Sequence, residues 1–195
     1  MKAKIDPEDT IRELSRPLVI EDLRQSDEQT REDRADRYLE VNQQGFIANQ
    51  HFASASAECL YLYRDGHFIA TVMTTQAVNE GILKFVAERN NIQKTDYCNL
   101  RALLKRLVSQ GIFSQDCFEA SKQIYKSFRN DVHHMNPKVA QIDFQELAKK
   151  NIKNLSVIER EIWAAYHNEK GLVPLQPKYW DKNPDGTVTI SLRWS

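Results

Sequence analysis

The segment 129–134 carries five side chains that could act together in chemistry on a phosphodiester. Arg129 offers a planar, permanently charged guanidinium that can bind a phosphate through two hydrogen bonds. His133 and His134 can each donate or accept a proton near neutral pH. Asn130 and Asp131 add a carboxamide and a carboxylate. A phosphodiester that is attacked by its own ribose 2′-hydroxyl needs little beyond a proton-transfer group and a cation, so these residues could cleave RNA without a metal.

The same residues also fit a purely structural role. Arg129 precedes His133, and Asn130 precedes His134, by four positions, so all four could form the polar end of a helix. Histidines at a helix C-terminus are favoured by the helix dipole. A metal site at Asp131 and the two histidines is disfavoured, because adjacent residues on a helix point about 100° apart. We therefore expect neither a metal nor a cofactor.

The composition is that of one ordinary globular protein. The chain has 195 residues, of which 41% are hydrophobic and 28% charged, and it is long enough to bury a substantial core. A formal net charge of zero excludes a general polyanion binder, so contact with RNA requires a local basic patch.

Two further features indicate a cytoplasmic protein. Cys59, Cys98 and Cys117 are odd in number and widely spaced, which matches a reducing compartment better than a disulfide framework. No apolar run approaches the roughly 20 residues that span a bilayer, and the first residues lack the apolar core of a signal peptide. We expect no membrane association.

The elements that must position the motif are predicted to be helices. Half of the first 40 positions are charged, so residues 1–37 are expected to form an exposed helical arm that starts at Asp6 and Pro7. A helical bundle is predicted over residues 38–170, and its helices are expected at 46–64, 67–90, 96–110, from 114 into the motif, and 143–168 with an interruption near 154–156.

Two of these helices matter most for the motif. The helix at 67–90 is apolar on more than one face and should be central. The helix that starts at Ser114 should carry the motif as its last turn, with Ile124 and Phe128 facing inward, and should end before Pro137. Such an arrangement would hold the polar residues of the motif in place.

After Gly171 the pattern changes from helix to strand. Pro174 and Pro177 exclude a helix, and residues 187–194 alternate between apolar and polar with a period of two. A turn at 183–186 precedes them, so residues 171–195 are predicted to form a β-hairpin with 172–180 as the partner strand. The expected fold class is all-α, a helical bundle with a C-terminal β-hairpin appendage.

Glu80 lies on the apolar stripe of the helix at 67–90. At 3.6 residues per turn it shares that stripe with Ile69, Met73, Leu83 and Ala87. It either reaches water from the edge of the stripe or is partly buried and orients a cation such as Arg129.

The segment 129–134 resembles the signature of the HEPN superfamily (higher eukaryotes and prokaryotes nucleotide-binding domains). That signature is an arginine directly followed by a polar residue and, after four to six residues, by a histidine. Arg129, Asn130 and His134 match it, with four residues between the arginine and the histidine. Residues 75–83 of an upstream helix and the late position of the motif are also similar to the family, over roughly residues 40–140.

The resemblance implies a helical bundle that forms a homodimer and brings two motifs into one cleft. Many such domains are metal-independent endoribonucleases of toxin–antitoxin or defence systems. Carried over, Arg129 would bind the scissile phosphate of RNA, His134 would act in acid–base catalysis and Asn130 would position the substrate. His133 could share or take the role of His134, and Glu80 and Asp131 would support the site.

Two other interpretations stay open. Some domains of this kind are non-catalytic and bind a nucleotide or a partner protein, and a toxin would have an antitoxin protein as its partner. Alternatively, the chain is a helical scaffold with an incidental arginine–histidine pair, which predicts a monomer without affinity for RNA.

Overall fold

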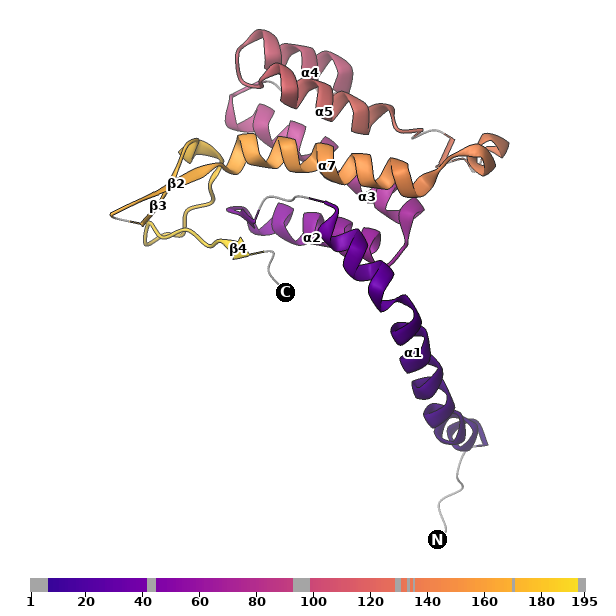
Figure 1. Cartoon of the computed structure of the whole chain (residues 1–195). Coiled ribbons are helices and arrows are strands. Elements are labelled where there is room, and N and C mark those ends of the chain that lie inside the picture. Colours follow the sequence, from indigo (N-terminus) through magenta and orange to yellow (C-terminus); the bar gives the residue numbers. More distant parts are fainter. Residues whose placement is uncertain are drawn as a thin grey trace.

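The computed structural model describes residues 7–41, 45–92, 99–128, 131–132, 134, 136–169 and 171–192. Within these ranges the chain forms six α-helices and four short strands, and the strands lie in two antiparallel pairs (Figure 1). The predicted fold class, all-α with a small C-terminal hairpin, is confirmed.

Five helices form the bundle. They are α2 (Gln50–Arg64), α3 (Phe68–Arg89), α4 (Leu100–Ser109), α5 (Gln115–Lys126) and α7 (Phe144–Trp163). α3 contacts the other four helices, and α7 contacts α2, α3 and α5. In Figure 1, α4 and α5 lie on one side of α3 and α7, and α2 lies on the other side. The central position predicted for the helix at 67–90 is therefore confirmed.

Short polar side chains start four of these helices. Asn49, Asn99, Ser114 and Asp143 each accept a hydrogen bond from a backbone N–H group in the first turn that follows, over 3.0 to 3.1 Å. Such a cap stabilises a helix by about 1 kcal/mol. The start predicted at Ser114 is confirmed, whereas the helix predicted from residue 96 begins at Leu100.

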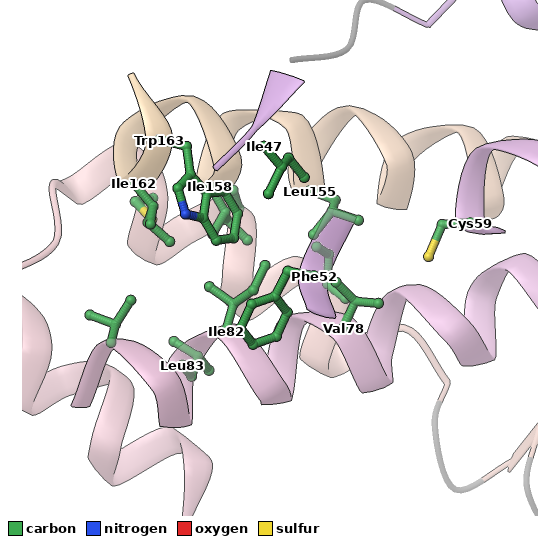
Figure 2. Packing of buried hydrophobic residues seen from close by; sticks show 14 of the residues in the cluster. Ile47, Phe52, Cys59, Val78, Ile82, Leu83, Leu155, Ile158, Ile162 and Trp163 are labelled. Atoms are coloured by element: carbon green, nitrogen blue, oxygen red, sulfur yellow. The ribbon is translucent and has the colours of Figure 1, made fainter. Parts of the chain in front are cut away.

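The core lies between α2, α3 and α7. Figure 2 shows its apolar side chains packed between these helices: Ile47, Phe52, Val78, Ile82, Leu83, Leu155, Ile158, Ile162 and Trp163. Full burial of a side chain of this size stabilises the fold by about 1.5–3 kcal/mol. Trp163 also donates through Nε1 to the backbone carbonyl of Tyr179 over 3.1 Å. This bond attaches the short 3₁₀ helix η3 (Pro177–Tyr179) to the end of α7.

The helix predicted over 46–64 starts later than expected. Phe46 and Ile47 form strand β1 (Phe46–Ile47), which pairs antiparallel with β4 (Ser191–Leu192). Ile47 is fully buried, so the strand attaches the C-terminal segment to the core. The alanine-rich segment after it forms α2 as predicted.

The C-terminal half of the last helix also differs from its prediction. α7 runs without interruption through 154–156 and ends at Trp163, where the predicted helix continued to residue 168. The chain then forms β2 (Ala165–Asn168), which pairs with β3 (Gly171–Pro174). Gly171 has a φ of +110°, a conformation that suits glycine at this tight turn. Tyr166, which falls within the predicted helix, lies on β2 and is half-exposed.

The strand pairing predicted for the C-terminal segment is wrong. The segment predicted at 172–180 pairs with β2 through its first residues, and β4 pairs with β1. An isolated bridge pairs Val188 with Lys182, which follows the predicted partner strand and is not part of it. The turn between them does form, with a hydrogen bond from the Asn183 N–H to the Thr187 carbonyl over 2.8 Å.

Helix α1 (Pro7–Leu39) extends away from the bundle (Figure 1). Pro7 is its first residue, as predicted, and the proposed cap Asp6 lies outside the described residues. Apolar side chains in its first half are largely exposed, and Leu18 is 74% exposed. The last turns bind the bundle, since Arg37 Nε donates to the carbonyl of Arg64 over 2.7 Å. Among the described helices, none combines the length and apolar character needed to cross a membrane.

Candidate functional site

The motif does not form the last turn of α5. The helix ends at Lys126, and Phe128 adopts a φ of +53° in the left-handed region. Its side chain is 46% exposed, so the prediction that Phe128 faces inward is wrong. A left-handed conformation is costly for a residue with a β-carbon, and such residues often occur at functional sites. The chain therefore turns sharply immediately before Arg129.

A buried polar cluster lies where the chain leaves α5. The amide Nε2 of Gln76 on α3 donates to both the carbonyl oxygen and the hydroxyl of Ser127, over 2.7 and 2.8 Å. Asn151 on α7 donates to the Ser127 hydroxyl and to the Thr75 hydroxyl, each over 3.1 Å. The Ser127 hydroxyl itself donates to the carbonyl of Ile124. Residues from three helices thus determine the position of Ser127.

The side chains that form these hydrogen bonds are buried. Gln76, Ser127, Thr75 and Asn151 are at most 5% exposed. A buried polar group that loses its partner costs about 1–3 kcal/mol, so the cluster resists rearrangement. Within the described part of the chain, the Gln76 Oε1 atom has no hydrogen-bond donor. The Gln76 Oε1 atom is therefore a buried acceptor whose hydrogen-bonding capacity none of the described residues satisfies.

A second polar pair joins α3 to α5 one turn further along. The Ser121 hydroxyl donates to Asn79 Oδ1 over 2.8 Å, and Asn79 Nδ2 donates to the Ser121 carbonyl over 3.2 Å. Sequence reasoning did not assign a role to these residues or to Gln76 and Asn151. The available signal was the presence of polar residues at positions 75, 76 and 79 within the most apolar helix of the chain.

Part of the motif lies within the described residues. Val132 is buried and its N–H donates to the Phe128 carbonyl over 2.9 Å. Asp131 is partly buried and accepts from Asn136 Nδ2 over 3.0 Å. His134 is exposed to solvent. Val132 therefore anchors the segment while the His134 side chain is accessible.

The predicted site residues Arg129, Asn130 and His133 lie outside the described residues, and so does Met135. The proline expected to end the helix, Pro137, is the first residue of the 3₁₀ helix η2 (Pro137–Gln141).

Glu80 is partly buried, with 24% of its side chain exposed, and its carboxylate accepts from Lys84 Nζ over 2.6 Å. The cation in contact with Glu80 is a lysine one turn along the same helix and not a residue of the motif. Contact with Arg129, the cation considered from the sequence, lies outside the described residues.

A groove of about 450 Å³ opens beside Phe128 and η2. Two cations, Lys138 and Lys150, and two carboxylates, Asp143 and Glu146, are among its lining residues. Lys150 lies 3.5 Å from Glu146, so its charge is partly compensated. The groove provides space for a polar ligand directly beside the motif segment.

In the described ranges, no three side chains of histidine, cysteine, aspartate or glutamate converge as metal ligands would. Comparisons of the chain with protein-family models, with curated proteins and with solved structures find no match.

Proposed function

We propose that the chain is a metal-independent endoribonuclease of HEPN type. The observation that carries the proposal is the Arg129–Asn130–His134 pattern on a segment that leaves the bundle at a left-handed Phe128. Two further features support it. A buried cluster around Ser127 holds the start of that segment, and the His134 side chain is exposed to solvent.

The proposed reaction is a transesterification within the RNA strand. The ribose 2′-oxygen forms a bond to phosphorus, and the bond from phosphorus to the 5′-oxygen of the next nucleotide breaks. The 2′-hydroxyl loses one proton and the leaving 5′-oxygen gains one, so no net proton is released. Arg129 binds the phosphate and stabilises the charge that develops on it. His134 transfers the proton, with His133 as the alternative, and Asn130 positions the substrate. The products end in a 2′,3′-cyclic phosphate and a 5′-hydroxyl.

We further propose that the chain forms a homodimer in which two motifs share one cleft. The proposed location of the protein is the cytoplasm. The odd number and wide spacing of the cysteines support a reducing compartment; Cys59 and Cys117 are buried and Cys98 lies outside the described residues. A toxin or defence role, with an antitoxin protein as partner, follows from the same resemblance.

The test is RNA cleavage by the purified full chain in the presence of a chelator. Transfer RNA or total RNA is the substrate, and the fragment ends are mapped for 2′,3′-cyclic phosphate. We expect Arg129→Ala and His134→Ala to abolish cleavage, and His133→Ala to show which histidine transfers the proton. Arg16→Ala on α1 and His167→Ala on β2 are matched controls, because both residues are exposed and far from the motif in sequence.

Circular dichroism and the thermal midpoint of each variant establish that the fold is intact. Full activity of both Arg129→Ala and His134→Ala would exclude the proposed site. Cleavage that requires a divalent metal would exclude the proposed mechanism.

The second candidate is a non-catalytic module that binds a nucleotide or a partner protein. The formal net charge of zero favours it, since RNA enzymes usually present excess positive charge to the phosphate backbone. The same experiment separates the two candidates. This module would bind a labelled nucleotide or RNA and yield no fragments.

A further inference from the structure

A second groove, of about 410 Å³, is lined by residues of α3, α4 and α5. Helices α4 and α5 lie together on one side of the bundle in Figure 1. This second groove is separate from the groove beside Phe128 and shares no lining residue with it. Helix α4 contributes Arg101 and Lys105 to its lining, and α5 contributes Phe118, Lys122, Tyr125 and Lys126.

The groove concentrates positive charge on a chain whose formal net charge is zero. Four of its lining residues are cations, and α4 contains no acidic residue. Lys122 pairs with Glu119 over 2.8 Å. Arg101, Lys105 and Lys126 have no carboxylate partner within the described part of the chain. The local excess of cations is the basic patch that contact with RNA requires on a neutral protein.

Two aromatic rings lie among these cations. Positions 118, 122, 125 and 126 fall on one face of α5, and positions 101 and 105 are one turn apart on α4. Tyr125 is 36% exposed, so one edge of the groove presents an accessible ring. Phe118 is partly buried, and Lys122 Nζ lies 5.3 Å from its ring centroid. The floor is apolar, formed by the buried Leu83 and Leu104.

An apolar floor, an accessible tyrosine ring and three cations without a carboxylate partner in the described residues are features by which proteins hold a single nucleic-acid strand. A base can stack on an aromatic ring, and lysine and arginine can bind the flanking phosphates. Double-stranded RNA would not suit the site, because its bases are not available for stacking. We infer that the α4–α5 groove binds single-stranded RNA. The choice of RNA rests on the proposed function. The evidence that the groove binds a single strand comes from its own lining residues.

The groove lies beside the motif along the chain. Lys126 is the last residue of α5, and Ser127 and the left-handed Phe128 follow directly. A strand that is held at Tyr125 and Lys126 therefore lies next to the end of the helix from which the motif segment departs. In this arrangement the groove provides affinity and the motif provides chemistry.

The test measures binding separately from cleavage. A fluorescein-labelled oligonucleotide of about 12 residues with 2′-O-methyl riboses lacks the nucleophile, so it reports binding alone by fluorescence anisotropy. We expect Lys105→Glu combined with Lys126→Glu to weaken binding by about 30-fold or more at low salt. The matched control is Lys153→Glu combined with Lys182→Glu, which changes the net charge equally at exposed positions outside the groove. The control should weaken binding by about threefold or less.

Two further measurements report on the mode of binding. The logarithm of the association constant should fall with the logarithm of the salt concentration with a slope of about −2 to −3, since three or four phosphates are contacted. Tyr125→Ala should weaken binding by about tenfold, whereas Tyr125→Phe should keep the affinity within about twofold, because stacking requires the ring and not the hydroxyl.

Several outcomes would overturn the inference: no binding of the oligonucleotide by the wild-type protein, an equal loss in the two double variants, or a preference for duplex RNA. If the wild-type protein binds through the groove and cleaves no RNA, the proposed function fails and the inference stands.

Discussion

Gln76 and Ser127 are joined by two hydrogen bonds from one donor atom. Gln76 Nε2 lies 2.7 Å from the Ser127 carbonyl oxygen and 2.8 Å from the Ser127 hydroxyl. The pair links the central helix α3 to the residue at which the chain leaves α5. The orientation of the motif segment therefore depends on a glutamine that carries none of the proposed chemistry.

Replacing Gln76 should affect both stability and cleavage. Gln76→Leu keeps a similar volume but removes the donor, so two buried oxygens of Ser127 lose a partner and stability should fall by about 1–3 kcal/mol. RNA cleavage should fall as well, measured at a temperature where the variant remains folded. Gln145→Leu on the exposed face of α7 is the control and should change stability by about 0.5 kcal/mol or less. Unchanged stability in Gln76→Leu would contradict the role assigned to the cluster.

The left-handed backbone at Phe128 predicts an unusual preference for glycine. Phe128→Gly should be about 1 kcal/mol more stable than Phe128→Ala, because glycine has no β-carbon to strain at a φ of +53°. The opposite order is expected for the exposed helical position Ala77, where Ala77→Gly should destabilise by about 1 kcal/mol. Chemical denaturation of the three variants measures these differences. The same sign at both positions would exclude strain at Phe128.

Glu40 should make the protein sensitive to acid. Burial would raise the pKa of Glu40, but hydrogen bonds from Lys149 and Tyr63 outweigh that effect and hold the pKa below its ordinary value of 4.5. A carboxyl whose pKa is lowered on folding stabilises the protein above its ordinary pKa, and this contribution is lost as the pH falls through the folded pKa.

The thermal midpoint of the wild-type protein should therefore decrease as the pH is lowered below about 4.5. In Glu40→Gln this decrease should be smaller. At neutral pH the Glu40→Gln protein should be less stable than the wild type by about 1 kcal/mol, because the carboxylate no longer receives the two bonds. The exposed Glu58→Gln on α2 is the control. An acid profile of Glu40→Gln that is identical to the wild-type profile would exclude this linkage.

Substitutions at two neighbouring residues of α7 test which face of this helix packs in the core. Ile158 is fully buried in the cluster of Figure 2, and Val157 is partly exposed. Ile158→Ala should destabilise the protein by about 2–5 kcal/mol, because it leaves a cavity between helices. Val157→Ala should cost about 1 kcal/mol or less. Similar costs at the two positions would contradict the packing of α7.

The homodimer is tested by the mass of the particle in solution. Sedimentation equilibrium should give twice the 22.7 kDa of one chain, and the value should fall towards a single chain on dilution. A single chain at all concentrations that support RNA cleavage would show that one motif is sufficient.

Local signals explain which elements could be predicted. Ser114 caps a helix because its hydroxyl reaches the N–H of Cys117, an interaction that needs only neighbouring residues. The helix at 67–90 could be placed at the centre because its apolar residues cover more than one face. The strands could not be paired correctly, because β1 (Phe46–Ile47) and β4 (Ser191–Leu192) are far apart in the sequence and the local pattern carries no information about their contact.

In the candidate site, too, some features could be predicted from local signals and others depended on contacts between distant segments. The groups available for phosphate chemistry could be identified from side-chain type and spacing alone, as Arg129, Asn130 and His134 show. The folded chain was needed to show that α5 ends at Lys126, that Phe128 turns the chain and that Gln76 and Asn151 hold Ser127. The two kinds of interaction differ in the sequence distance over which they act. Helix capping and apolar periodicity act over a few residues, whereas a buried hydrogen bond or a groove between helices exists only after distant segments have packed together.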